Sequence, residues 1–285
     1  VGQGSFITNT TGSNNVVVGT EAMTANTTAS NNTAIGHQSL YANTTGASNT
    51  ATGYSALGSN TTGTENVSLG FLALGNNTTA NANTGLGKYA LGGNTTGGSN
   101  TAVGWHSLGG NTTGGANTAV GKGSLDANTT GASNTAIGLD SLGGNTTGLY
   151  NAAVGLGALQ NNTTANSNSA VGYTALFNNT TGASNTAVGH TALYANTTGA
   201  NNTTLGYQAG NNLTTGSNNI MIGSYAHSSS NGSELVIGNN TAGKGNNTGF
   251  ISPPAGGNMY QASNGTTWAQ TSDERLKKNI VNNDV

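Results

Sequence analysis

The chain of 285 residues lacks cysteine, has only two prolines and carries little charge, with 5% of its residues being Asp, Glu, Lys or Arg. Without cysteine it has no disulfide bonds and no thiolate chemistry. Its formal net charge of −2 offers no basic stripe for phosphate groups, so we expect no nucleic-acid partner. No apolar run approaches the roughly 18 to 20 residues that span a bilayer, so we expect a soluble chain without membrane insertion.

What the chain has instead is one motif repeated every 17 residues. A glycine recurs at this spacing without insertion from Gly2 to Gly223. Four residues before it stands asparagine in every repeat from Asn15 to Asn219, and a Thr pair follows it by eight and nine residues from Thr10 onward. Fixed side chains at fixed positions indicate that each unit occupies the same place in a stack, as in solenoid proteins.

The consensus unit is Asn-Thr-Ala-Val-Gly-x-x-(Ser/Ala)-Leu-x-x-Asn-Thr-Thr-Gly-x-x, and its first five residues alternate as a short strand does. Thr and Val or Ile then point to one side, and Asn, Ala and Gly to the other. We expect Val or Ile to share a thin interior with the Leu that follows the glycine by four residues. The predicted fold is all-β, a β-solenoid (β-roll) of about 13 turns with two short strands per turn, each turn rising about 4.8 Å.

Two columns of asparagine are predicted to run along this stack as ladders, because an Asn amide can bond the amide one turn away or the backbone of a corner. One column runs from Asn9 to Asn196 and is broken by Leu213. Its copies lie in Asn-Thr-Thr, so an exposed coat of N-linked glycans is the alternative to a ladder. The other column supplies the candidate ladder residues Asn32, Asn49, Asn66, Asn83, Asn100, Asn117, Asn134, Asn151, Asn168 and Asn185.

The residue directly after the repeat glycine varies most, which predicts an outward-facing column. Its rings could meet a sugar or another surface, or they could simply cover the thin core and stack on one another. The candidate ligand residues of this column are His37, Tyr54, Phe71, Trp105, Tyr173, His190 and Tyr207.

Catalytic and metal-binding constellations are not expected in residues 1–250. The acids Glu21, Glu65, Asp126, Asp140 and Glu234 fall at unrelated positions of the repeat, so we expect that no two converge. The histidines lie in different turns and are expected to be solvated, and we predict no enzyme, metal or cofactor. A solenoid glycan hydrolase, which needs two carboxylates roughly 5 to 9.5 Å apart, is a less favoured alternative.

Ice binding is a further alternative, because Thr pairs stack along the chain. Adjacent threonines point to opposite faces, however, so we expect an Asn-x-Thr row rather than a Thr-x-Thr row on display.

The regular repeat loosens after Gly223, where the next Val-Ile-Gly ends fifteen residues on at Gly238. We predict a solenoid shaft over residues 1–245 and an extended connector, containing both prolines, over 246–271. A different segment follows over 272–285 and reads as the start of a helix capped by Ser272.

The sequence Ser-Asp-Glu-Arg-Leu-Lys-Lys-Asn-Ile from Ser272 to Ile280 resembles the opening of the endosialidase-type intramolecular chaperone domain, which ends many phage tail fibres and tailspikes. The resemblance implies a chaperone that assists trimerisation of the preceding fibre and then cuts the chain between Thr271 and Ser272. It also implies that Lys277 is needed for this cut, in keeping with a Ser that is activated by a Lys base. The alternative is that Ser272 is only a helix cap. Residues 272–285 are too few to fold or to cut.

The strand motif Asn-Thr-Ala-Val-Gly is also similar to that of trimeric autotransporter adhesin heads, which are left-handed β-rolls with a shorter repeat. Both resemblances imply the shaft of an extracellular or virion fibre, a homotrimer that supports attachment to a host and contacts a surface glycan. We expect the small residues opposite Val and Ile to line the contact between the three chains, namely Ala34, Ala51, Ala102, Ala119, Ala136, Ala153, Ala170 and Ala187.

Overall fold

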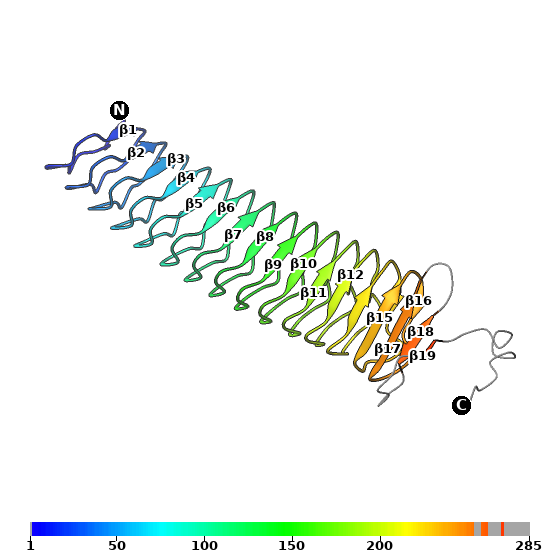
Figure 1. Cartoon of the computed structure of the whole chain (residues 1–285). Coiled ribbons are helices and arrows are strands. Elements are labelled where there is room, and N and C mark those ends of the chain that lie inside the picture. The colour runs from blue at the N-terminus through cyan, green and yellow to red at the C-terminus, as the bar shows by residue number, and fades with distance from the viewer. Residues whose placement is uncertain (1, 254–257, 262–268, 271–285) are drawn as a thin grey trace, which may run out of the picture.

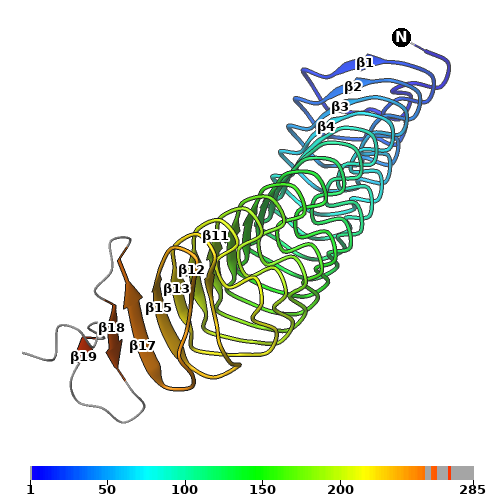
Figure 2. The same cartoon turned by 90° about the vertical axis from the view of Figure 1, so that its right-hand side faces the viewer.

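The computed structural model describes residues 2–253, 258–261 and 269–270. These residues form an all-β solenoid of about 14 turns without any helix, as the sequence predicted. Successive turns stack along one axis into a rod, with the N-terminal turn at one end (Figures 1 and 2). The strands are β1 (Val16–Val18), β2 (Thr33–Ile35), β3 (Thr50–Thr52), β4 (Val67–Leu69), β5 (Thr84–Leu86), β6 (Thr101–Val103), β7 (Thr118–Val120), β8 (Thr135–Ile137), β9 (Ala152–Val154), β10 (Ser169–Val171), β11 (Thr186–Val188), β12 (Thr203–Leu205), β13 (Ile220–Ile222), β14 (Ala226–His227), β15 (Glu234–Gly238), β16 (Thr241–Ala242), β17 (Thr248–Ser252), β18 (Met259–Gln261) and β19 (Ala269–Gln270).

Each regular turn contributes one strand of three residues to a parallel sheet that runs the length of the rod. Thr33 pairs with Thr50, Ala34 with Ala51, and the same step of 17 residues continues from β1 to β13. The rest of each regular turn consists of tight turns and bends. The expectation of two strands per turn was therefore wrong for these turns. Among the described residues, a second strand per turn appears only in β14 and β16, near the C-terminal end.

The interior is built from alanine, leucine and asparagine. Ala136 and Leu142 are fully buried, as are the other alanines and leucines at their two repeat positions, whereas Ile137 is 40% exposed. In the first turns, Val17 and Phe6 take these positions and are partly buried. The prediction that Val and Ile face the interior with Leu was wrong, because the strand presents its alanine side inward. The narrow interior explains this: a Cβ added at Gly85, in the alanine position, would lie 3.3 Å from Cγ of Leu74. Beside a core Leu there is room for little more than a methyl group. The branched Thr204 occupies the alanine position next to Gly210, which replaces the core Leu, and a Cβ at Gly210 would lie 2.8 Å from Cγ2 of Thr204.

The corners of each turn depend on left-handed backbone. The repeat glycine Gly104 has a φ of 132°, and a Cβ there would lie 2.6 Å from the carbonyl oxygen of Gly121 in the next turn. Non-glycine residues are also left-handed at three places per turn, for example Gln38, Leu40 and Ser48. Such a conformation costs roughly 1 to 2 kcal/mol per residue. The N–H groups of these three residues each donate a hydrogen bond to a neighbouring turn, so stacking offsets the cost.

Two asparagine ladders join the turns from inside. In the strand ladder (Asn15 to Asn219), the N–H of Asn117 donates to Oδ1 of Asn100 over 2.9 Å, and its Nδ2 donates to the carbonyl of Gly131 over 2.9 Å. In the loop ladder (Asn9 to Asn196), Nδ2 of Asn128 donates to Oδ1 of Asn111 over 2.8 Å and also to Gly131 over 2.9 Å. Both ladders thus meet at one carbonyl oxygen in each turn.

Each ladder ends at a replaced residue. Leu213 follows Asn196 in the loop ladder, and Oδ1 of Asn196 is buried without a hydrogen-bond partner. In the strand ladder, Glu234 takes the asparagine position, and its N–H donates to Oδ1 of Asn219 over 2.9 Å. The buried Glu234 carboxylate accepts hydrogen bonds from Ser229, Ser230 and the N–H of Gly245.

Parallel pairing continues beyond residue 245, where we predicted the shaft to end. Ile220 pairs with Leu235, and Leu235 pairs with Gly249, so the last turns contract to 15 and then 14 residues. β18 then reverses direction and pairs antiparallel with β17 inside the predicted connector. The segment 271–285, including Ser272, Lys277 and the expected helix, lies outside the described residues.

The end of the loop ladder yields a prediction on stability. Replacing Asn162 with Leu leaves Oδ1 of Asn145 and Nδ2 of Asn179 without their ladder partners, and we expect this to lower the free energy of unfolding by about 1 to 3 kcal/mol. Asn196→Leu should cost measurably less, because it also removes an oxygen that has no partner. Urea unfolding of the two variants compares them directly, and an equal or larger loss at Asn196 would contradict the ladder account.

Candidate functional site

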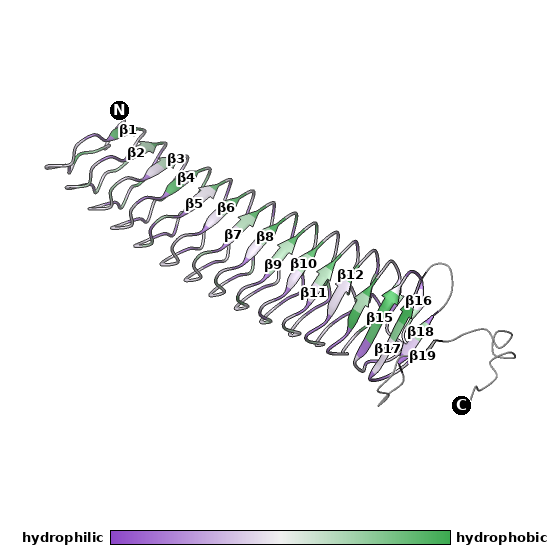
Figure 3. Cartoon of the chain, viewed as in Figure 1, coloured by the Kyte–Doolittle hydropathy of each residue, from purple (hydrophilic) through white to green (hydrophobic). Residues whose placement is uncertain are grey.

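The outer side of the sheet carries an apolar face made of two adjacent columns. One is the aliphatic residue directly before the repeat glycine, and the other is the variable residue directly after it. Figure 3 shows hydrophobic residues recurring along the line of strands. The exposed members of the apolar face are Val18, Ile35, Leu69, Ile137, Val154, Val171 and Leu205 in the first column, with Tyr54, Phe71, Trp105, Leu139, Leu156, Tyr173 and Tyr207 in the second.

The seven candidate ligand residues after the repeat glycine all lie exposed in the second column. All of their rings except that of Trp105 stack on one another. The centroids of His37 and Tyr54 are 5.3 Å apart with planes at 7°, and those of Tyr54 and Phe71 are 5.2 Å apart at 13°. Tyr173, His190 and Tyr207 form a second stack. Ring faces inside these stacks are already covered, so the column offers mainly ring edges to a ligand.

A trough runs beside the apolar face over four consecutive turns. Five residues after the repeat glycine, these turns have Gly58, Gly75, Gly92 and Gly109, and the same position holds Tyr41 in the turn before and Asp126 in the turn after. Two hollows of about 260 and 280 Å³ lie along it. They share Leu72, Gly75 and Asn76, so the trough is continuous across them. Sequence reasoning missed this trough, although the run of glycines at one repeat position was visible.

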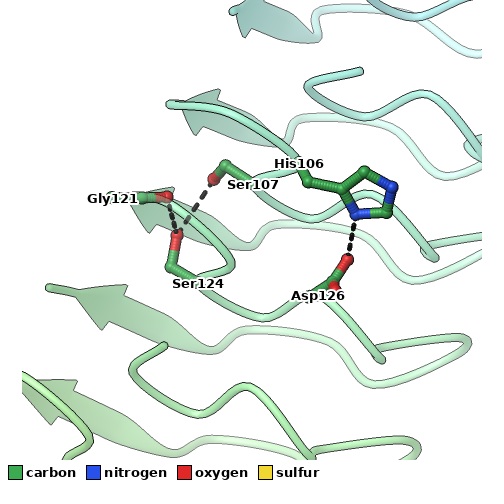
Figure 4. Close-up of polar contacts among 5 residues, drawn as sticks. All are labelled: His106, Ser107, Gly121, Ser124 and Asp126. Carbon is green, nitrogen blue, oxygen red and sulfur yellow. Dashed lines mark hydrogen bonds and ion pairs between the residues drawn. The ribbon is translucent and has the colours of Figure 1, made fainter. Parts of the chain in front are cut away.

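His106 and Asp126 close one end of the trough (Figure 4). Nδ1 of His106 contacts Oδ1 of Asp126, and both side chains are partly exposed, at 40% and 44%. Ser107 does not complete a catalytic triad with them, because its Oγ is buried and bonds to the carbonyl of Ala119 and to Oγ of Ser124. In Figure 4 this hydroxyl lies on the opposite side of the chain from the imidazole.

Two acids do come together, contrary to expectation. Asp126 and Asp140 lie in adjacent turns, and both line a separate hollow of about 330 Å³ that also contains Gln160. The expectation that no two acids would converge was wrong for this pair, because residues two and five positions after the repeat glycine share one corner of the solenoid. Asp126 also contacts His106, which lines the trough and not this hollow.

The histidines do not gather into a metal site. Within the described residues, no three His, Asp or Glu side chains are placed to hold a metal ion together. His37 and His190 are exposed, as expected for solvated residues. His227 differs, because its Nδ1 is buried and has no hydrogen-bond partner.

The chain has no match among family models, curated proteins or solved structures. Over the described residues, no helix is long and apolar enough to cross a bilayer. The fold itself defines a β-solenoid repeat protein, and its two outward features are the apolar face and the trough.

The buried loop ladder predicts where sugars are absent. The loop-ladder asparagines from Asn43 to Asn196 are fully buried, so a folded chain cannot carry a glycan on them. The terminal Asn9 is partly exposed, and the prediction does not include it. Asn239, in Asn-Asn-Thr, is exposed and serves as the control acceptor. When the folded protein is secreted from a glycosylating yeast, mass spectrometry should find hexosamine on Asn239 and none on the loop ladder. Hexosamine on the ladder asparagines of folded protein would show that this column faces solvent.

Proposed function

We propose that this chain is the structural shaft of an extracellular or virion fibre, assembled as a homotrimer, that supports attachment to a host or surface. The single observation that carries the proposal is the apolar face, which continues along an uninterrupted rod. Contiguous exposed apolar surface of this extent is typical of a protein–protein contact. The extracellular or virion location is supported by the sequence resemblances to tail fibres and adhesin heads.

The contact between chains is proposed on the apolar face and not on the alanines. Ala136 and the other alanines of the predicted contact are 0% exposed inside a single chain, so the earlier assignment was wrong. Its premise was that Val and Ile fill the interior. Because the strand points its alanines inward, Ile137 and its equivalents are the apolar residues left exposed, and a contact between chains would bury them. Ala136→Glu would then disrupt the fold of one chain instead of only blocking assembly.

The apolar face carries little that would oppose close approach of chains. Its two basic residues, Lys88 and Lys122, place their Nζ atoms 5.7 Å from the ring centroid of Phe71 and 5.0 Å from that of Trp105. A lysine whose ammonium group lies over an aromatic ring keeps its aliphatic side-chain carbons on the apolar surface. The face is therefore suited to burial along most of its length.

The trimer is tested by placing charge on the apolar face. Leu69→Glu, Ile137→Glu and Leu205→Glu together introduce carboxylates four turns apart on exposed positions, where a single chain tolerates them. In a trimer they would meet in a dry contact, so assembly should fail. Light scattering should give three times 27.9 kDa for the wild-type chain and one chain mass for the variant, with unchanged circular dichroism.

Thr113→Glu is the matched control, because Thr113 is exposed on a corner away from the strands. This variant should remain trimeric. A stable wild-type monomer, or a triple variant that still forms trimers, would contradict the proposal.

Ice binding is the second candidate function, favoured by one feature of the same sheet. Thr84, Thr101, Thr118 and Thr135 each begin a strand, and they stand in register about 4.8 Å apart. The Asn-x-Thr row expected at the Thr pairs is not on display, because its asparagines, such as Asn43, are buried. The fibre proposal predicts no thermal hysteresis of the purified shaft. Clear hysteresis that Thr118→Glu abolishes would favour ice binding instead.

A further inference from the structure

We infer that the trough formed by Gly58, Gly75, Gly92 and Gly109 is a binding site for an extended, uncharged glycan. The site lies wholly within one chain and uses residues outside the apolar face. The inference therefore does not rest on the proposed trimer, although a glycan site suits a shaft that contacts a host surface.

The four glycines are not required by the backbone. None of them is left-handed, and the equivalent position holds Tyr41, Asp126, Gln160, Phe177 and Tyr194 in other turns. A Cβ at Gly75 or Gly92 would come no closer than 3.2 Å to its neighbours, the carbonyl oxygens of Leu72 and Tyr89. The fold thus accepts side chains at these two positions, whereas a Cβ at Gly109 would lie 2.5 Å from Nδ1 of His106 and would require the imidazole to move. Glycine at this repeat position in four successive turns instead leaves open space, and backbone atoms form the floor of the trough.

The walls of the trough combine apolar surface with hydrogen-bonding groups. Leu72 and Tyr89 are partly exposed along one side. Tyr89 stands two residues after the repeat glycine, outside the ring column, and meets Phe71 edge to face, with the ring planes at 76°. Ser59 and Asn76, which carry a hydroxyl and an amide, also line the trough. Sugar rings present apolar C–H faces and hydroxyl edges, which match this mixture of partners.

The charge and the length of the trough indicate which class of ligand it could bind. The residues lining its two hollows include no Asp, Glu, Lys or Arg. The charged groups at its margins already have partners, because Asp126 contacts His106 and Nζ of Lys88 lies 5.6 Å from the ring centroid of Tyr89. The trough therefore offers little to an anionic or cationic polymer and suits an uncharged one. Four turns at about 4.8 Å give an open length of about 19 Å along the axis, which favours a linear oligosaccharide over a compact ligand.

The test fills the trough and measures binding of defined sugars. The probes are cellohexaose, maltohexaose and chitohexaose, with saturation-transfer NMR and calorimetry as readouts. We expect at least one probe to bind the wild-type chain, and Gly92→Gln to weaken that binding by about tenfold or more. Gln160 occupies the equivalent position in another turn, so the substitution should leave the fold and the melting temperature unchanged.

Gly115→Asn is the matched control, because it adds a side chain of similar kind on a different corner, where other turns have Asn81 and Asn166. It should bind as the wild-type chain does. The inference is overturned if no probe binds the wild-type chain, or if Gly92→Gln binds equally well. Light scattering of the same samples reports the oligomeric state independently, so a failed trimer and a failed glycan site are distinguished.

Discussion

The structure depends on hydrogen bonds that link each turn to the next through buried asparagine side chains. In the strand ladder, the side-chain amide of Asn117 accepts a hydrogen bond from the N–H of Asn134, one repeat further along the chain, and donates one to the carbonyl of Gly131, three residues before Asn134. The N–H of Asn117 in turn donates to Oδ1 of Asn100 in the preceding turn. The loop ladder adds an amide-to-amide bond, and the shared carbonyl fixes the two ladders relative to each other. Because a buried amide without partners costs about 1 to 3 kcal/mol, each turn is held in one register.

This register makes the other features of the chain possible. A thin interior of one Leu and small side chains per turn buries little apolar surface, and left-handed corners add to the cost of each turn. An isolated turn could not persist, but stacked turns share the ladder and the corner hydrogen bonds. Where the repeat changes, compensation is local. Gly210 replaces the core Leu, and a Cβ there would lie 3.2 Å from the sulfur of Met221, which fills the space from the next strand.

Much of this architecture could be predicted from the sequence, because periodicity reports directly on stacking. The spacing of glycine and asparagine predicted the solenoid and its 17-residue step. The direction of the strand could not be predicted in the same way. Alternation shows that Thr33 and Ile35 share a side, but it does not show which side is inward. That depends on the width of the interior, which the close approach of Leu74 to Gly85 reveals.

The ring column and the trough on the surface were predicted less well, because they depend on how side chains of different turns lie relative to one another. The ring column was visible because its residues vary, but its internal stacking needed coordinates. The trough is defined by missing side chains, and glycines such as Gly75 look unremarkable in a chain with 47 of them. The pairing of His106 with Asp126 joins different repeat positions, so a search for one repeated position overlooks it.

Hydrogen exchange of the asparagine side chains tests the central role of the ladders most directly. The Nδ2 protons of buried residues such as Asn117 and Asn128 should exchange only when the whole rod unfolds, whereas those of the exposed Asn161 should exchange within the dead time. NMR spectra of the ¹⁵N-labelled protein after transfer to D₂O distinguish these amides. Protected ladder amides are the predicted result. Rapid loss of the Asn117 and Asn128 side-chain signals from folded protein would contradict the account.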